Sequence, residues 1–202
     1  MKQELQAQGT ATVRGFSEEI SAISGVQSVN IVENDQDITV DGRPPHSFEC
    51  YVEGGSDDEV AQTIYDKKPL GIRNVTTLPD SQGFEKRTGT IVTVNGDVQE
   101  LEFSSPIRTT IYIKVSITTD AAFATNGQQQ LREAILAYME LQDIGSTLYT
   151  HKLYTPVTTV LGVVTAEITT GRTEGAYSPE NIAAVSYEYL VADENSILIE
   201  EA

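Results

Sequence analysis

The sequence has a single cysteine, Cys50, and no tryptophan in 202 residues. One thiol cannot form an internal disulfide or a multi-cysteine metal site. The sequence also lacks a recognisable signal peptide and any apolar run long enough to span a bilayer, so we expect synthesis in a cytoplasm without an export address of its own. At this length folding buries about 70% of the unfolded chain's surface, so a core needs neither metal nor disulfide.

Basic residues are scarce: 13 Lys and Arg stand against 30 Asp and Glu, which gives a formal net charge of −17. A surface of this sign repels phosphate backbones and anionic membranes, so we expect no nucleic-acid partner and no membrane partner. The simplest interpretation of the charge is solubility. The sharper interpretation is that the surface complements a basic partner protein.

Histidines are also few, and neither fits a metal-binding pattern. His46 and His151 lie far apart in the sequence, without spacing such as H-E-x-x-H. His46 and Cys50 could approach each other across one strand face, but two ligands do not make a metal site. Cys50 lacks the electropositive setting of a reactive thiolate. It alternates with Phe48 and Val52 and is interpreted as a small core residue.

Two stretches resemble ligand sites only in part. The acidic residues 35, 37 and 41 are spaced somewhat like a calcium loop, but Val40 and His46 stand where such a loop needs glycine and glutamate, so a solvated acidic turn is predicted. Gly54-Gly55-Ser56 could hold an anion at a helix start. It lacks the lysine of a phosphate-binding loop, and the two aspartates that follow would repel phosphate.

No other pattern marks a reactive group. The sequence contains no G-x-S-x-G motif. Paired carboxylates such as Asp57-Asp58 and Glu200-Glu201 are common in so acidic a chain, and nothing marks one pair as general acid and base. We therefore predict no catalytic, cofactor-binding or metal-binding residues, no cofactor, and no enzymatic activity.

The stretch from Gly42 to Ile72 is the most informative part of the chain. Alternation over residues 48–53 predicts a half-buried strand. Gly54-Gly55 predicts a sharp corner. Ser56 predicts a helix N-cap, and Glu59 three residues later completes a capping-box pattern. The helix carries apolar residues at 60, 61, 64 and 65 and ends before Pro69.

The remaining patterns predict an α+β fold with mainly antiparallel sheets, a few helices and two small subdomains. Residues 1–105 are expected to contain a helix near 13–23, strands, the capped helix and a hairpin at Asn95-Gly96. Residues 106–202 are expected to contain a long strand at 107–118, helices at about 128–143 and 147–160, and closing strands. Ser105-Pro106 separates the two parts. Tyrosine is favoured at protein interfaces. Five tyrosines in the second half are candidates for such exposure, although packing is the simpler interpretation of most of them; these five are Tyr149, Tyr154, Tyr177, Tyr187 and Tyr189.

Several segments together resemble the baseplate J-like family of contractile phage tails. The most specific are P-P-H-S at 44–47, V-E-G-G at 52–55, E-V-A at 59–61, I-Y at 64–65 and K-P-L-G-I at 68–72. Weaker matches follow in the family's order: F-S-S-P-I-R-T-T-I-Y-I-K-V at 103–115, D-I-G at 143–145 and V-L-G-V-V at 160–164. The resemblance covers about residues 15–199, and family members have a longer preceding region. We therefore expect this chain to correspond to the C-terminal portion of such a protein.

The resemblance implies a structural wedge component of the baseplate, which links the centre to the periphery. The implied partners are other baseplate proteins and neighbouring copies of the same chain, with no small-molecule substrate. The implied location is the virion tail baseplate, with assembly in the host cytoplasm. The family has no catalytic residues to carry over. An acidic helix start at Asp57 and Asp58 is expected to face a neighbouring subunit, and lysines there are expected to impair assembly but not folding.

Two alternatives remain open at this stage. A carbohydrate-binding or adhesin-like tail accessory would carry a surface groove with clustered exposed tyrosines. A hydrolase would need two carboxylates about 5–10 Å apart in a cleft.

Overall fold

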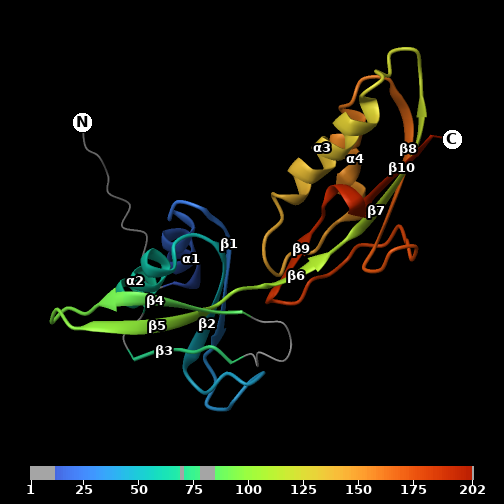
Figure 1. Ribbon diagram of the computed structural model, residues 1–202. Helices are drawn as coiled ribbons and strands as arrows, with labels where there is room; N and C mark the ends of the chain where they lie inside the picture. The colour runs from blue at the N-terminus through green and yellow to red at the C-terminus, as the bar shows by residue number, and fades with distance from the viewer. Residues whose placement is uncertain (1–11, 69–70, 78–84, 202) are drawn as a thin grey trace, which may run out of the picture. The chain divides into compact units, whose positions relative to one another are not determined.

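The computed structural model describes residues 12–68, 71–77 and 85–201 (Figure 1). These residues form an α+β fold with 4 helices and 10 strands, which confirms the predicted fold class. The chain divides into two compact units, Met1–Ile107 and Arg108–Ala202. Each unit has its own cluster of buried apolar side chains.

The first unit is a mixed sheet with two helices. The strand order is β1-β2-β5-β4, and β3 also pairs with β2. β2 pairs antiparallel with β1 and parallel with both β3 and β5. β4 pairs antiparallel with β5. The elements are α1 (Val13–Ser21), β1 (Val26–Asn34), β2 (Ser47–Gly54), α2 (Asp57–Lys67), β3 (Arg73–Asn74), β4 (Lys86–Val92) and β5 (Val98–Ser104).

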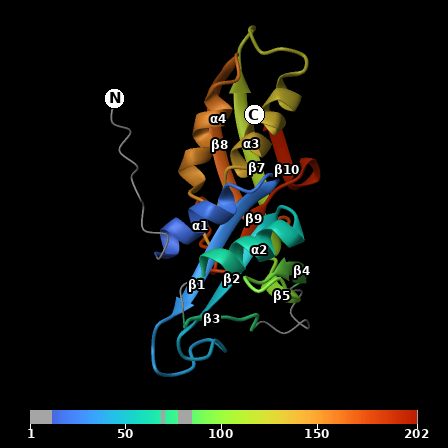
Figure 2. The same ribbon diagram turned by 90° about the vertical axis from the view of Figure 1, so that its left-hand side faces the viewer.

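Both helices lie on the same side of this sheet, as Figure 2 shows for α1 and α2 in front of β1 and β2. Apolar residues spaced three or four apart on each helix meet alternate residues of the strands, which is the pattern that buries one helix face and one sheet face. The buried cluster comprises Phe16, Ile20, Ile31, Phe48, Cys50, Val52, Val60, Ala61, Ile64, Ile91 and Phe103.

The prediction of a half-buried strand at 48–53 is wrong for β2. Every residue from Ser47 to Val52 is buried, including Glu49 and Tyr51 on the face away from the helices. For Glu49 the reason is local: Thr77 and Ser104 hydrogen-bond its carboxylate. Polar residues supplied by a neighbouring segment therefore let a charged side chain occupy a buried strand position.

The glycine corner after β2 is present as predicted, with φ of 77° at Gly54 and 76° at Gly55. A Cβ on Gly54 would lie 2.2 Å from the carbonyl oxygen of Gly25, so only glycine fits there. Ser56 occupies the N-cap position of α2, but its side chain makes no capping hydrogen bond. The predicted capping box is therefore absent, and the first-turn carboxylates contact β4 instead.

The hairpin predicted at Asn95-Gly96 is confirmed. β4 and β5 pair from Lys86↔Ser104 to Val92↔Val98. The turn is closed by the Gly96 amide donating to the Thr93 carbonyl at 2.8 Å, and Gly96 has a φ of 84°. β4 begins at Lys86, and residues 78–84 before it lie outside the described residues. β3 comprises Arg73 and Asn74 alone.

The second unit combines a three-stranded sheet with a two-stranded ribbon. The sheet has the order β10-β7-β8, with β8 antiparallel and β10 parallel to β7, and β6 pairs with β9. The elements are β6 (Ile107–Thr110), β7 (Tyr112–Thr119), α3 (Gly127–Met139), the 3-10 turn η2 (Thr150–Leu153), α4 (Tyr154–Thr158), β8 (Val163–Gly171), β9 (Glu188–Val191), the 3-10 turn η3 (Glu194–Ser196) and β10 (Ile197–Glu201).

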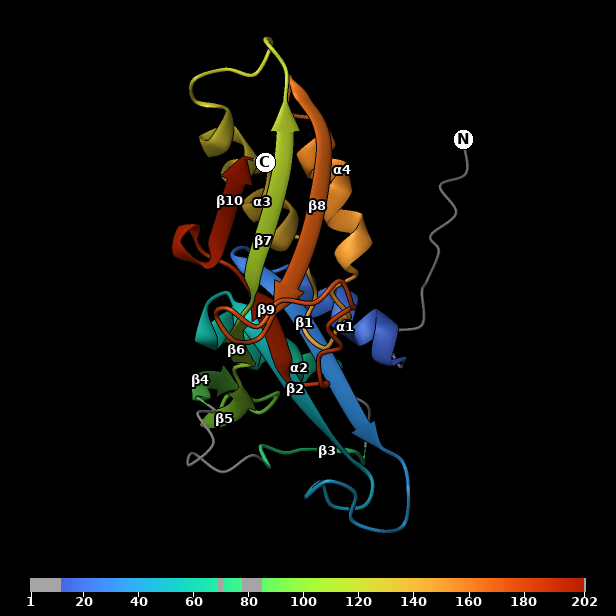
Figure 3. The same ribbon diagram turned by 90° about the vertical axis from the view of Figure 1, so that its right-hand side faces the viewer.

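Helices α3 and α4 cover one face of this sheet, behind β10, β7 and β8 in Figure 3. The predicted apolar face of the long strand is buried at Ile111, Ile113, Val115 and Ile117. The strand itself is broken at Ile111, whose amide donates to the Val191 carbonyl at 2.8 Å. One continuous strand was predicted, and the switch of partner explains why β6 and β7 are separate.

The helices of the second unit are shorter than predicted. α3 ends at Met139 rather than near residue 143, and the region 147–160 contains only η2 and the five-residue α4. Pro156 falls in the first turn of α4, where a proline needs no amide partner. Among the described residues, no helix is long and apolar enough to cross a membrane.

Candidate interaction surface

The two histidines and the cysteine do not come together. Cys50 is fully buried in the first core, and burial raises the pKa of its thiol, with the charge of Glu49 adding to the effect. His46 is exposed, and its Nε2 lies 3.0 Å from a carboxylate oxygen of Asp37. His151 packs edge-on against the Tyr149 ring. Within residues 12–68, 71–77 and 85–201, no group of three His, Cys, Asp or Glu side chains could hold a metal ion.

The acidic residues at 35–41 form a solvated loop, as predicted. Asp35, Asp37 and Asp41 are exposed. Asp37 faces His46, and Asp41 accepts a hydrogen bond from Arg43 at 3.1 Å. Two of the three carboxylates, those of Asp37 and Asp41, therefore pair with neighbouring side chains.

The acidic start of α2 is bound within the first unit. Asp57 accepts a hydrogen bond from Arg87 Nε at 2.7 Å, and Asp58 accepts one from the Thr90 amide at 2.7 Å. Both carboxylates are therefore engaged within the unit, and the expectation that this helix start faces a neighbouring subunit stays a prediction. Lysines at both positions would disturb the fold itself, so that pair of changes cannot test an interface.

Arg87 holds the glycine corner in place. Its guanidinium donates to the carbonyls of Val52, Gly54 and Gly55 at 3.2, 2.7 and 2.8 Å. Its charge lies 4.8 Å from the centre of the Phe103 ring. A planar guanidinium can satisfy several acceptors and stack on a ring at the same time, which an ammonium cannot do. This contact rigidifies the most specific part of the family resemblance.

Sequence reasoning missed the buried carboxylate of Glu49. It accepts hydrogen bonds from the Thr77 amide at 3.0 Å, the Thr77 hydroxyl at 2.6 Å and the Ser104 hydroxyl at 2.9 Å. Arg43 Nη1 lies 3.8 Å away. A glutamate between apolar strand positions normally signals the solvent face, so the alternation gave no sign of this burial. With three donors on its oxygens, the carboxylate is a structural anchor.

A second anchored carboxylate, Glu188, lies in the second unit. Arg172 forms a bidentate pair with it, and the Thr109 hydroxyl donates to it at 2.6 Å. These hydrogen bonds, of which that from Arg172 has the largest effect, lower the pKa of Glu188 although burial opposes them.

The carboxylates of Glu200 and Glu201, considered above as a possible acid–base pair, also have partners. Glu200 pairs with Lys114 at 2.9 Å, and Glu201 accepts a hydrogen bond from Gln128 at 3.1 Å.

The five tyrosines singled out from the sequence have different environments. Tyr189 is buried, and the Tyr154 hydroxyl accepts a hydrogen bond from the Ile168 amide at 3.2 Å. Tyr149 is exposed, with the Lys152 ammonium 4.8 Å from its ring centre. Tyr177 and Tyr187 are half-buried. Packing therefore explains part of this set, as the simpler interpretation predicted.

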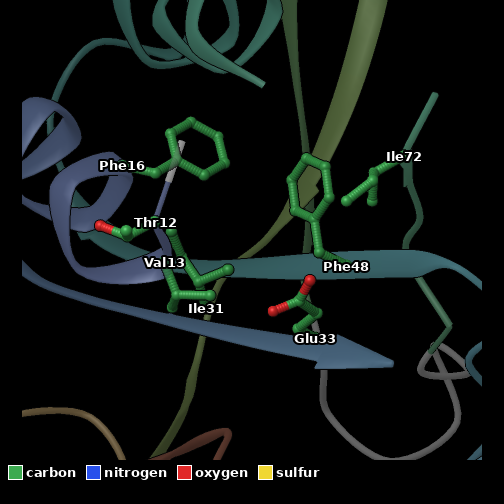
Figure 4. Close-up of a pocket in the computed structure, with 7 residues that line it drawn as sticks. All are labelled: Thr12, Val13, Phe16, Ile31, Glu33, Phe48 and Ile72. Atoms are coloured by element: carbon green, nitrogen blue, oxygen red, sulfur yellow. The ribbon is translucent and has the colours of Figure 1, made fainter. Parts of the chain in front are cut away.

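The described residues carry an apolar hollow in the first unit, between the start of α1 and the β1–β2 strands (Figure 4). Its volume is about 90 Å³, several times the space that one water molecule needs. Phe16 and Phe48 meet edge to face, with ring centres 5.4 Å apart. The lining comprises Thr12, Val13, Phe16, Ile31, Glu33, Phe48 and Ile72.

An apolar projection lies elsewhere on the same unit, at the tip of the β4–β5 hairpin. Val92, Val98 and Val94 are 53%, 69% and 90% exposed. Val92 and Val98 are direct cross-strand partners, so their side chains share one face. In Figure 1 this hairpin extends beyond the end of α2. Clustered exposed apolar side chains on a hairpin tip are typical of a protein contact.

Among the described residues, the groups considered for chemistry are enclosed or already bonded. Cys50 is enclosed, and burial raises the pKa of its thiol, whereas a thiol must be ionised to react. The anchored carboxylates are saturated by donors. No protein-family model and no curated protein matches the chain.

Proposed function

We propose that this chain is a structural component of a phage or prophage contractile-tail baseplate, a wedge protein. It acts in assembly through contacts with other baseplate proteins and with neighbouring copies of itself. It is not an enzyme and binds no cofactor, small-molecule substrate, nucleic acid or membrane. It resides in the virion tail baseplate after assembly in the host cytoplasm.

The observation that carries the proposal is the run from Gly42 to Ile72, which resembles the baseplate J-like family. The part of this run that includes β2, the glycine corner and α2 is held together by Arg87 and by buried apolar side chains. A rigid element of this kind suits a component that transmits force between subunits. The exposed valines of the hairpin and the apolar hollow supply surfaces on which such a component can associate.

The acidic charge supports partners that present basic surfaces. With a net charge of −17, association with cationic proteins is accelerated at low salt, and contact with DNA or anionic lipid is disfavoured. Binding to other tail proteins should therefore weaken as ionic strength rises.

Electron microscopy of particles tests the location directly. An epitope tag in the hairpin turn would disturb a candidate contact, so the tag belongs in the loop near Gly175, which has open space around it. Gold-labelled antibody should mark the baseplate end of purified tails. Antibody that binds free protein but no tail would refute the proposal.

The alternative is a carbohydrate-binding or adhesin-like tail accessory module. Glycan binding relies on exposed aromatic side chains gathered in a groove, and the burial of Tyr189 and the bonded hydroxyl of Tyr154 weaken that idea. Micromolar binding on a glycan array, lost on Tyr149→Ala, would favour the alternative instead.

A further inference from the structure

We propose that the β4–β5 hairpin of one copy inserts its valine tip into the apolar hollow of a neighbouring copy. The inference rests on the proposed function in one respect, since an assembled baseplate is where copies are held side by side. The contact itself is argued from two surfaces of the first unit, the hairpin tip and the hollow, neither of which is covered by an apolar side chain among the residues that the structure describes.

The hairpin tip offers both an apolar group and free donors. Val94 is 90% exposed at the turn. The amides of Val94 and Asn95 have no acceptor among the described residues, because the turn hydrogen bonds use Thr93, Gly96 and Asp97. An inserted tip would thus bring one small aliphatic side chain and two backbone N–H groups.

The hollow offers the complementary groups. Phe16, Phe48 and Ile72 supply apolar walls, and its volume of about 90 Å³ admits a small branched side chain rather than an aromatic ring. Glu33 lies at the same site with an exposed carboxylate that no described residue binds. That carboxylate can accept hydrogen bonds from turn amides once the valine is inserted.

These features select a second copy of this chain as the occupant. The shape, the apolar character and the donor–acceptor pairing are all matched by a segment that the chain itself carries. The projection and the hollow are different surfaces, so the contact is head-to-tail: each copy uses its hairpin on one neighbour and its hollow on the other. Contacts of this type generate a ring when the rotation closes and a filament when it does not.

Cross-linking between single-cysteine variants tests the contact. Val94→Cys places a thiol on the tip and Val13→Cys places one at the hollow, where Val13 is 40% exposed. The native Cys50 is fully buried and does not compete. Concentrated equal mixtures are treated with a short bismaleimide, and the mixed dimer is quantified on a denaturing gel. Leu141→Cys, which is 77% exposed in the second unit, replaces the tip variant in the control mixture.

We expect the tip and hollow variants to form at least about tenfold more mixed dimer than the control pair, because contact raises the effective concentration of the two thiols. Adding Val98→Asp to the tip variant should return the yield to the control level. Equal yields from both mixtures, in concentrated protein and in purified tails carrying both cysteines, would overturn the inference. A cross-link to a different tail protein would do so as well.

The outcomes separate this contact from the proposed function. Tails that carry the antibody label at the baseplate but give no cross-link between copies would leave the function standing and remove the contact. A cross-link in purified protein together with unlabelled tails would keep the contact and remove the baseplate assignment.

Discussion

The side-chain amide of Gln62 binds both backbone groups of Val92. Its oxygen accepts from the Val92 amide at 2.8 Å, and its nitrogen donates to the Val92 carbonyl at 3.2 Å. One turn earlier on α2, Asp58 accepts from the Thr90 amide. The two side chains therefore occupy the outer edge of β4, where an unpaired strand would otherwise invite another chain. Helix α2 acts here as a substitute for a neighbouring strand.

Gln62→Leu should destabilise the first unit by about 1 kcal/mol, because Val92 loses both side-chain partners while the helix keeps its shape. Urea unfolding would measure the loss, and hydrogen exchange should show the Val92 amide exchanging faster than in the native protein. Thr63→Ala is the matched control on the same helix turn. An unchanged Val92 exchange rate in the Gln62 variant would contradict this role.

Gly89 permits the close approach of α2 to β4. A Cβ at this position would lie 2.1 Å from the Asp57 carbonyl oxygen and 2.5 Å from the Ala61 Cβ. Since backbone and a buried methyl are both in the way, Gly89→Ala should cost about 1–3 kcal/mol, as overpacking does elsewhere. Thermal unfolding compared with Thr88→Ala, an exposed neighbour on the same strand, measures the effect. Equal stability of the two variants would mean that the helix can move away at no cost.

Arg87→Lys should behave as a severe change although it preserves the charge. The guanidinium serves three carbonyls and Asp57 at once, whereas an ammonium cannot span the same fork. Two or more lost charge-assisted hydrogen bonds predict a loss of about 3 kcal/mol in the free energy of unfolding. Lys86→Arg provides the reverse exchange on the adjacent residue. Near-native stability of Arg87→Lys would show that the corner holds without this fork.

Local chemistry made the start and the turn of several elements predictable. The apolar spacing of Phe16 and Ile20 identified α1, and Asn95-Gly96 identified the hairpin, because each depends on residues close in sequence. The burial of Glu49 and the strand break at Ile111 could not be predicted, because each depends on residues far away in the sequence. The burial of Glu49 depends on Thr77 and Ser104, at separations of 28 and 55 residues. The break at Ile111 depends on its bond to Val191.

The candidate surface shows the same division. The acidic start of α2 was predictable from the sequence, but its partners were not, because Arg87 and Thr90 lie in β4, about 30 residues further along the chain. It gave no sign of the hollow, which forms only where Val13, Ile31 and Phe48 from three elements meet. The exposure of the hairpin valines could not be predicted either, because β-branched side chains are common in strands whether they are exposed or buried.

The Glu188–Arg172 pair predicts a pH-dependent contribution to stability in the second unit. The pKa of Glu188 is lowered in the folded chain, chiefly by hydrogen bonds from Arg172. Its contribution is therefore complete above the pKa of an unfolded glutamate, about 4.3, and disappears as the pH falls through the lower folded value. At neutral pH Glu188→Gln should reduce the free energy of unfolding by about 1–2 kcal/mol, a range kept modest because Arg172 is partly exposed.

Urea unfolding of the native protein and of Glu188→Gln, followed from neutral pH to about pH 3, checks this dependence. The difference in free energy of unfolding between the two proteins should stay constant down to about pH 5 and then become smaller. Protonation of Glu188 removes the charge from the native protein, and the glutamine variant already lacks that charge. Glu174→Gln, an exposed neighbour without a partner among the described residues, should show no gap that changes with pH. If the difference in free energy of unfolding is as large in acid as at neutral pH, the pair stabilises the fold through packing and not through charge.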